Sequence, residues 1–275
     1  MIAPDLIARP DQPVRRRPLV TCRKVSKRFA NKTLALSEVD LDVGQHQFLS
    51  LLGPSGCGKS TLLRLISGLT EPSSGAIEWP TEPYDASGKP KPNLSFVFQE
   101  PTLLPWANAL SNVMLPLNLA RTPKAEARAR AEAALDLVGL AKFASAYPRE
   151  LSGGMKMRVS IARAIVTKPS VLLLDEPFAA LDEITRFKLN RDLLDLWGRG
   201  DFTVIFVTHS VFESVFLSQR IVVMAARPGR VIADMAIDAP YPRLPDFRLT
   251  PQYNEYCRLT SEALERAMQD EELER

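Results

Sequence analysis

The chain has 275 residues, of which 45% are hydrophobic and 24% charged, enough apolar sequence for one large domain or two small ones. Its net charge of +3 is too small to indicate a nucleic-acid-binding protein, so we expect no nucleic-acid partner. Three cysteines without CxxC spacing exclude a disulfide framework and a cysteine-based metal site, and they favour a reducing compartment.

The N-terminal residues predict a flexible tail. Residues 1–18 contain four prolines and the basic run Arg15–Arg17, but no apolar stretch of signal-peptide length. A functional basic patch is the alternative interpretation of that run. Nothing in the sequence approaches the ~18 consecutive apolar residues of a membrane-spanning helix, so we expect another chain to supply any membrane part.

The next residues predict an antiparallel pair and then a strand, a turn and a helix. Residues 19–25 and 36–43 alternate partly between apolar and polar side chains, as half-exposed antiparallel strands do. Residues 47–52 form a short apolar run before a glycine, which is typical of a buried parallel strand. A helix with several leucines on its packed faces is expected at 59–69.

The middle of the chain predicts a helical subdomain. Three segments are expected before it, namely a strand at 76–79, a loop at 81–93 and a strand at 94–98. Residues 100–168 are rich in Ala and Leu with helical spacing, for example over 125–138 behind Thr122-Pro123. We therefore expect a helical insertion in an α/β core.

The core resumes as alternating strands and helices. Strands are predicted at 171–174, 203–207 and 221–225, and helices at 183–197 and 211–217. Such alternation predicts a mostly parallel core sheet covered by helices, accompanied here by the antiparallel β subdomain near the N-terminus.

Several prolines from residue 240 onward mark a boundary before the C-terminus. A helix is predicted at 252–269, with Tyr253, Tyr256, Leu264 and Met268 near one face that is expected to pack rather than to bind a cofactor. The predicted organisation is a tail at 1–18, a main domain at 19–240 that includes the helical subdomain at about 100–168, and a C-terminal helical extension at 241–275.

Residues 53–61 match the phosphate-binding pattern GxxxxGK[ST] between a predicted strand and a predicted helix. Glycines let backbone N–H groups approach phosphate oxygens, and the helix N-terminus adds partial positive charge. ATP binding is predicted for Gly53, Pro54, Ser55, Gly56, Cys57, Gly58, Lys59, Ser60 and Thr61. Lys59 would contact the β- and γ-phosphates, and the Ser60 hydroxyl would bind Mg²⁺. A chance glycine turn is the alternative, and Cys57 is either a small filler or a redox-sensitive thiol.

Two acids follow the strand predicted at 171–174. Asp175 would hold Mg²⁺ directly or through water, and Glu176 is placed to accept a proton from an attacking water. Alone, the two acids could merely begin a loop. Together with the phosphate-binding pattern they predict a centre for ATP hydrolysis.

Leu151-Ser152-Gly153-Gly154 opens a helix predicted to run to Ile165. A helix N-terminus with a serine and two glycines forms a second anion-binding site. Because one ATP does not need two such sites on one subunit, we expect Ser152, Gly153 and Gly154 to contact the γ-phosphate held by a second copy of the chain.

Taken in order, these motifs resemble the ATP-binding-cassette (ABC) ATPases over about residues 19–235. The resemblance rests on the segment at 53–61, Gln99, LSGG at 151–154, LLLDEP at 172–177, Ala180-Leu181-Asp182 and His209. It implies the P-loop NTPase fold of the ABC-ATPase type, Mg²⁺-dependent ATP hydrolysis and a head-to-tail homodimer. LSGG, Gln99 and His209 argue against a P-loop kinase or GTPase.

The resemblance also implies roles for four single residues. Gln99 would contact Mg²⁺ or the attacking water, and Asp182 would lie beside the site of the other subunit. His209 would orient the water at the γ-phosphate, and Phe29 would stack on adenine. A core histidine and a core phenylalanine are the respective alternatives for the last two.

Met155 and Ser210 depart from the glutamine and the aspartate that are commoner in the family at these positions. Neither replaces a group that touches phosphate.

Several stretches are similar to the nitrate/sulfonate/taurine branch of bacterial importers, which also includes transporters of pyrimidine precursors of thiamine. They are Phe98–Pro101, Leu104–Trp106, Met155, Asp175–Phe178, Ala180–Asp182 and Ala226–Arg230. The similarity implies integral membrane permease subunits, a periplasmic or extracytoplasmic solute-binding protein, and a peripheral location at the cytoplasmic face of the inner (cell) membrane. Those partners would choose the solute. The alternatives are an exporter and a non-transport ABC ATPase that acts on a macromolecular partner.

Overall fold

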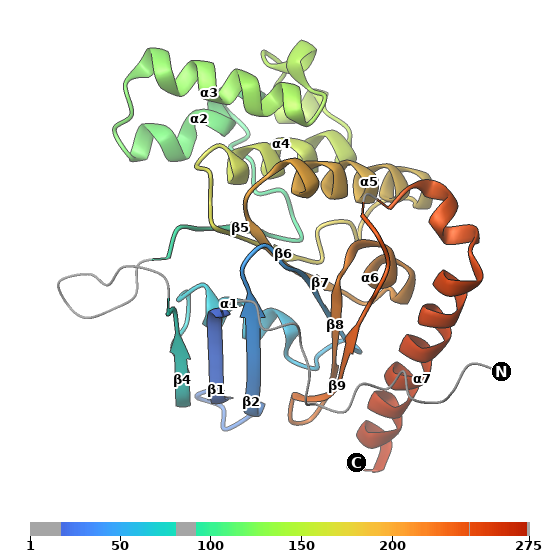
Figure 1. The fold of residues 1–275 in the computed structure, drawn as a ribbon. Helices are drawn as coiled ribbons and strands as arrows, with labels where there is room; N and C mark the ends of the chain where they lie inside the picture. The colour runs from blue at the N-terminus through green and yellow to red at the C-terminus, as the bar shows by residue number, and fades with distance from the viewer. Residues whose placement is uncertain (1–17, 81–91, 242, 274–275) are drawn as a thin grey trace. The chain divides into compact units, whose positions relative to one another are not determined.

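A computed structural model describes residues 18–80, 92–241 and 243–273 (Figure 1). These residues group into two compact units. The first unit combines residues up to 92 with residues 203–275, and the second comprises residues 93–202. Most of the predicted tail at 1–18 and of the predicted loop at 81–93 lies outside the described residues.

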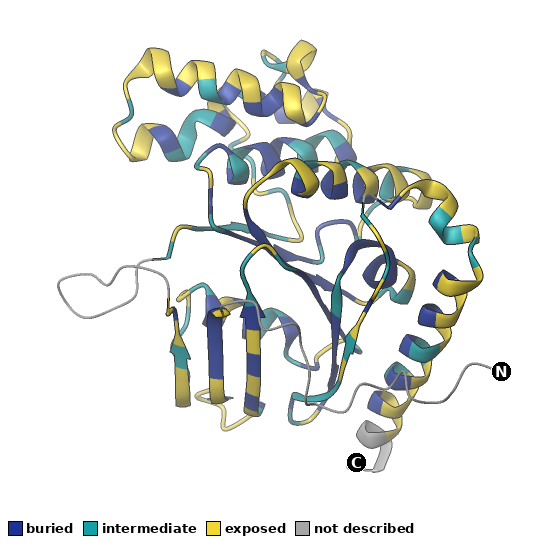
Figure 2. Cartoon of the chain, in the orientation of Figure 1, coloured by how far each residue is buried: buried dark blue, intermediate teal, exposed yellow. Residues whose placement is uncertain are grey.

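A three-stranded antiparallel sheet opens the first unit. Its strands are β1 (Pro18–Arg28), β2 (Leu34–Gly44) and β4 (Ser74–Glu78), in the order β2-β1-β4. Buried and exposed side chains alternate along much of β2, as expected for a strand with one solvated face, whereas β1 is buried without a break from residue 19 to residue 22 (Figure 2). The predicted antiparallel pair is confirmed.

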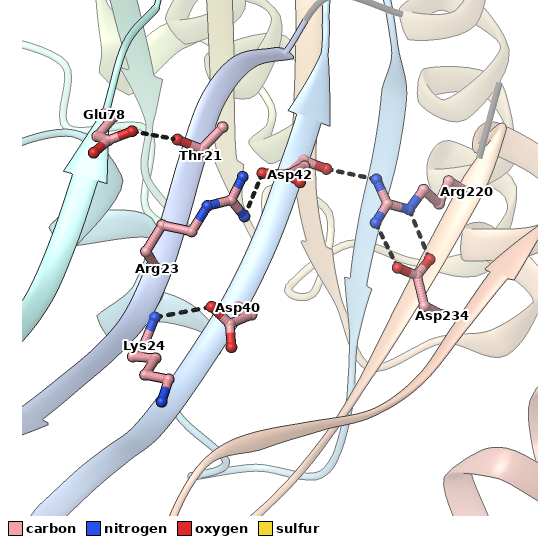
Figure 3. A network of polar contacts seen from close by, with 8 residues as sticks. All are labelled: Thr21, Arg23, Lys24, Asp40, Asp42, Glu78, Arg220 and Asp234. Carbon is pink, nitrogen blue, oxygen red and sulfur yellow. Dashed lines mark hydrogen bonds and ion pairs between the residues drawn. The ribbon is translucent and has the colours of Figure 1, made fainter. Parts of the chain in front are cut away.

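Polar contacts cross the solvated side of this sheet and continue onto the neighbouring strands (Figure 3). Arg23 pairs with Asp42 at 2.8 Å. Arg220 donates to the Asp42 carbonyl at 2.5 Å and forms a two-bond pair with Asp234. Because Arg220 and Asp234 belong to β8 and β9, these bonds tie the antiparallel sheet to the core strands of the same unit.

The core strands of the first unit run in the order β7-β3-β8-β9. Their bounds are β3 (Phe48–Leu52), β7 (Thr203–Thr208), β8 (Arg220–Ala225) and β9 (Arg230–Ala236). β3 is parallel to both of its neighbours and is buried along its whole length, which explains its continuous apolar sequence. The antiparallel edge strand β9 was not predicted, because most of its residues are half-buried and lack a clear apolar alternation.

The helices of the first unit are α1 (Lys59–Ile66), α6 (Val211–Leu217) and α7 (Pro251–Leu273), with a 3-10 helix η4 (Pro245–Leu249) before α7. α1 ends earlier than the predicted residue 69, because Gly68 adopts a left-handed φ of 72° and stops the helix. In α7 the predicted packed face is only partly right. Tyr253 and Tyr256 are buried, but Met268 is 52% exposed and the alanines at 263 and 267 pack in its place.

The second unit contains the parallel pair β5 (Leu94–Val97) and β6 (Val171–Asp175) and most of the helices. The helices are α2 (Ala109–Leu119), α3 (Lys124–Leu137), α4 (Gly153–Ile165) and α5 (Glu183–Arg199), with the short 3-10 helices η2 (Ala141–Phe143) and η3 (Pro148–Glu150). α2 packs on α3 and α4, which confirms a helix-rich segment between β5 and β6. In the described part of the chain, no helix combines the length and the apolarity needed to cross a membrane.

Candidate functional site

The segment at 53–61 forms the turn between β3 and α1, where three of its residues must be glycine. A Cβ on Gly53 would lie 2.4 Å from the Met224 carbonyl oxygen, and a Cβ on Gly58 would lie 2.5 Å from Leu36 Cδ2. Gly56 and Gly58 adopt φ values of 80° and 92°, which side chains other than glycine rarely accept. The glycines therefore allow the close backbone path that a phosphate-binding loop needs.

Lys59 closes this loop from the first turn of α1. Its side chain is nearly buried, and Nζ donates to the carbonyl oxygens of Gly53 at 2.8 Å and Pro54 at 2.9 Å. The Cys57 thiol lies 3.8 Å from the same ammonium, and burial raises the pKa of this thiol. Cys57 thus fills space under the loop as a protonated thiol, which favours the first of its two interpretations.

Gly229, which is distant in the sequence, packs against this loop and bonds to β2. The Gly229 N–H donates to the Ala35 carbonyl at 3.0 Å, and the Gly229 carbonyl accepts from the Ser37 N–H at 2.9 Å. A Cβ on Gly229 would lie 2.3 Å from the Cys57 carbonyl oxygen. In the sequence the segment around Gly229 indicates only the importer branch, and its packing against the loop is not apparent. The sequence feature that could have indicated this packing is a glycine in the short connection after the strand predicted at 221–225.

His209 follows β7 directly, and its side chain is exposed, so the alternative of a core histidine is wrong. The residues around it are linked by hydrogen bonds. Thr208 Oγ1 donates to the Glu213 carboxylate at 2.6 Å and accepts from the Ser210 N–H at 3.0 Å. Ser210 caps α6 by accepting from the Glu213 N–H at 3.3 Å. The serine that departs from the commoner aspartate is thus a helix cap.

Phe29 is 44% exposed, so the alternative of a core phenylalanine is wrong. The Lys27 ammonium lies 5.7 Å from the centre of its ring. Phe29 borders an open cavity of about 590 Å³ between β1, β2 and β4, together with Ser26, Arg28 and Ser73. An exposed ring beside a cavity is available for stacking on a planar ligand.

In the second unit, Gln99 and Glu176 follow two adjacent strands at matching positions. β5 and β6 are parallel with Val97 opposite Leu174, and each candidate lies two residues further on. Asp175, the last residue of β6, is 7% exposed. Glu176 has a left-handed φ of 46°, a strained conformation that clusters at functional sites. The structure therefore brings the three polar candidates Gln99, Asp175 and Glu176 to the same edge of this strand pair.

The LSGG segment begins α4, and Ser152 is exposed at its N-terminus. The Ser152 hydroxyl accepts from the Met155 N–H at 3.3 Å, so Ser152 is the helix cap. Gly154 is buried, and a Cβ there would lie 2.8 Å from Thr185 Cγ2. Gly154 is therefore also required for the packing of α4 against α5, a role that the sequence analysis does not foresee.

Asp182 caps α5 at the same end of the second unit. Its carboxylate accepts from the Thr185 N–H at 2.9 Å, and this bond holds the pKa of the exposed Asp182 carboxyl below its usual range. Since Gly153 and Gly154 approach Leu181 and Thr185, the capped ends of α4 and α5 are neighbours. The residues predicted to meet a second subunit thus share one exposed end of this unit.

The candidate residues are divided between the two units. The first unit holds the loop at 53–61, His209 and Phe29, and the second holds Gln99, Ser152–Gly154, Asp175, Glu176 and Asp182. Among the described residues, no cluster of three or more His, Cys, Asp or Glu side chains could hold a metal ion by itself.

Comparison with known proteins places these motifs in one family. The profile of the ABC transporter family matches residues 36–179. The taurine import ATP-binding protein TauB of Rhizobium johnstonii is 44% identical over 211 residues, which cover 77% of this chain and 79% of TauB. The aliphatic sulfonates import ATP-binding protein SsuB of Bacillus subtilis is 42% identical over 224 residues, which cover 80% of this chain and 86% of SsuB.

A solved structure supports the fold assignment. A dimeric ATP-binding cassette in a post-hydrolysis state, bound to ADP and Pi, has a TM-score of 0.68 and 32% sequence identity. The match covers 80% of this chain and all of the cassette. The predicted combination of a mostly parallel core sheet, an antiparallel β subdomain and helical regions is confirmed.

Proposed function

Because the chain belongs to the ABC transporter family and is an ATP-binding, ATP-hydrolysing protein, we propose that it energises a bacterial importer of a small solute. The solute class is that of nitrate, sulfonates, taurine or pyrimidine precursors of thiamine. Relatives that import taurine and aliphatic sulfonates support this choice, since their sequences align with most of this chain.

The observation that carries the proposal is the exposed N-terminal end of α4. Ser152 caps this helix and, like Gly153, is exposed, so both residues are accessible to a second subunit. A head-to-tail homodimer would place this end over the γ-phosphate bound to the loop at 53–61 of the other copy. ADP lacks the γ-phosphate, so ATP alone stabilises the closed dimer.

The residues of the first unit fit a bound nucleotide. The glycines of the loop permit the tight backbone path in which N–H groups can face phosphate oxygens, and Lys59 supplies a cation for the β- and γ-phosphates. Phe29 stacks on the adenine ring, for which its exposed face is suited. Pro54, Ser55 and Thr61 complete the loop.

The oxygen atoms of Ser60, Gln99 and Asp175 fit Mg²⁺, which prefers hard oxygen ligands. Oxygens of the substrate phosphates would supply further ligands. When bound, Mg²⁺ neutralises charge that develops on the phosphate oxygens. Glu176 accepts the proton of the attacking water, and its left-handed backbone is a strained conformation of the kind that clusters at functional sites. His209 contacts the γ-phosphate and orients the same water.

The proposed partners follow from the importer assignment. Two permease subunits cross the membrane, and an extracytoplasmic binding protein delivers the solute. The chain itself lies at the cytoplasmic face of the inner membrane, and Gln99 passes the state of the nucleotide to the permease.

The test is ATP-driven uptake by the assembled transporter. The tagged full-length chain is purified with its permease from membranes, reconstituted in liposomes with the binding protein, and supplied with labelled taurine, an alkanesulfonate or nitrate. We expect Mg²⁺-dependent uptake of one of these solutes. The matched control, Glu176→Gln, should bind ATP, accumulate as a closed dimer in gel filtration and transport nothing.

Two results would contradict the proposal. Uptake that continues with Glu176→Gln would remove the assignment of the general base. Purification with ribosomes or DNA, and without a permease, would favour the alternative of a non-transport ABC ATPase.

A further inference from the structure

The C-terminal segment of the chain donates hydrogen bonds to the carbonyls at the C-terminal end of α6, the helix that follows His209. A helix leaves its last four carbonyls without partners inside the helix. In α6 the Ser214 carbonyl accepts from the Ser218 N–H at 3.0 Å. The next two, of Val215 and Phe216, accept from Arg243 Nη1 at 2.6 and 3.1 Å.

The last carbonyl of α6 is also satisfied by the C-terminal segment. The Tyr241 hydroxyl donates to the Leu217 carbonyl at 2.7 Å. Near the other end of α6, the Tyr253 hydroxyl of α7 donates to the Phe212 carbonyl at 3.1 Å. Tyr241, Arg243 and Tyr253 therefore bind four carbonyls of a seven-residue helix, and α6 has little freedom to shift along or about its axis.

The central group of this arrangement is a buried cation. Arg243 is 3% exposed, and its guanidinium lies 4.3 Å from the ring centre of Tyr241 and 5.3 Å from that of Phe247. It sits at the negative end of the helix dipole, where a cation is stabilised. For stability alone, an apolar side chain of similar volume often serves as well in a buried site. The geometry that Arg243 imposes on α6 is thus the better explanation of the buried charge.

The fixed position of α6 also fixes the backbone of His209, through hydrogen bonds in the first turn of the helix. Thr208 and Glu213 are 2% and 7% exposed, and the hydrogen bonds among Thr208, Ser210 and Glu213 enclose the backbone of His209 on both sides. The position of His209 relative to β7 is therefore set by the position of α6.

We infer that Arg243 is a positioning residue for ATP hydrolysis, which acts by holding α6 and hence His209 in place. The inference rests on the proposed contact of His209 with the γ-phosphate. It assigns to the C-terminal segment a part in the reaction besides the packing of α7, through the two residues Arg243 and Tyr241.

The first measurement separates kcat from KM in the full-length chain. Arg243→Met should lower kcat for ATP about 10-fold or more, since small displacements of catalytic groups are costly. KM for ATP and the Kd for nucleotide should change less than about 2-fold, because the loop at 53–61 is untouched. Arg243→Lys, which can still donate to the carbonyls, should recover part of the lost kcat.

The second measurement observes His209 directly. The chain has two histidines, His46 and His209, so an imidazole NMR spectrum contains two sets of signals, which His209→Gln assigns. Arg243→Met should shift or broaden the His209 signals and leave those of His46 in place. A merely structural role would lower the melting temperature without this selective change.

The control is Arg258→Ala, on the same C-terminal segment. Arg258 is exposed and pairs with Glu255 and Glu262 in solvent, so kcat and both sets of signals should match the wild type. If His209→Gln lowers kcat while Arg243→Met changes neither kcat nor the His209 signals, the inference is overturned and the proposed function stands. If His209→Gln itself retains the wild-type kcat, the role of His209 fails first.

Discussion

The N-terminal end of α1 and the C-terminal end of α6 are buried ends of two short helices, and each is met by a cation. At α1 the cation is Lys59, which belongs to the helix and bonds to carbonyls five and six residues earlier. At α6 it is Arg243, which lies 27 and 28 residues beyond the carbonyls that it binds. The first arrangement is local in the sequence, and the second depends on the tertiary fold.

The two ends also differ in their electrostatics. At α6 the cation meets the negative end of the helix dipole, so the protein completes this end with its own groups. At α1 the Lys59 ammonium meets the positive end, and an anion is needed to balance the two. A helix end where two like charges converge therefore indicates a ligand, whereas one where opposite charges meet indicates a structural cap.

The largest effect is expected when the cation at the N-terminal end of α1 is removed. Lys59→Ala should raise the Kd for MgATP about 100-fold, because hydrogen bonds to charged groups contribute about 1.5–3 kcal/mol. Isothermal titration calorimetry of the full-length chain measures this change. Arg64→Ala, which removes an exposed cation from the last turn of the same helix, is the matched control and should bind as the wild type does. A Kd within about 3-fold of the wild type for Lys59→Ala would refute the phosphate-loop assignment.

The next largest effect tests whether the loop at α1 is as local as its pattern implies. Gly229→Ala would place a methyl group 2.3 Å from the Cys57 carbonyl oxygen and 2.8 Å from the Ala35 carbonyl oxygen. Overpacking of this kind costs about 1–3 kcal/mol, and the displaced loop should bind ATP about 10-fold more weakly. Denaturation in urea and the same calorimetry check the two effects.

Gly198→Ala is the control for this change. Gly198 lies within α5, and a Cβ there would meet no atom within 4 Å. We expect this variant to be more stable by up to about 1 kcal/mol, since alanine is the better helix former, and to bind ATP normally. If Gly229→Ala also bound ATP normally, the conformation of the loop at 53–61 would not depend on its contact with Gly229.

Local patterns account for what the sequence predicts of the fold and the site. The apolar run of β3, the glycines of the loop and the serine and aspartate caps at Ser152 and Asp182 depend on residues close in the chain. The family resemblance added the roles of Gln99, Phe29 and His209, and the structure confirms that the last two are exposed. Their contacts with nucleotide stay predictions.

Long-range contacts account for what the sequence does not reveal. Arg243 reads as one basic residue in a proline-rich connection, and only the tertiary fold brings it to α6. Gly154 reads as a phosphate-binding glycine, while its approach to Thr185 depends on how α4 packs on α5. The packed face of α7 was partly misjudged, because small alanines rather than large apolar residues face the core there.

A smaller effect is expected when an uncharged donor is removed from the C-terminal end of α6. Tyr241→Phe removes one hydroxyl and leaves the Leu217 carbonyl without that donor. The free energy of unfolding should fall by about 1–2 kcal/mol, as for other buried hydrogen bonds that lose one partner. The Kd for ATP should be unchanged, in contrast to Lys59→Ala. Urea denaturation that gives the wild-type midpoint would mean that the hydroxyl contributes nothing to the cap.

The smallest effect concerns a third helix end, which is exposed and capped by an acid. The Thr185 N–H holds the pKa of the Asp182 carboxyl below its unfolded value, so this cap stabilises the fold above the unfolded pKa and is lost as the pH falls through the folded pKa. Asp182→Asn keeps an oxygen acceptor but cannot titrate there. Between pH 6 and pH 3 the melting temperature of the wild type should therefore fall further than that of Asp182→Asn, by no more than about 2 °C. Parallel curves would show that the charge of Asp182 does not contribute to this end, and that the hydrogen bond alone makes the cap.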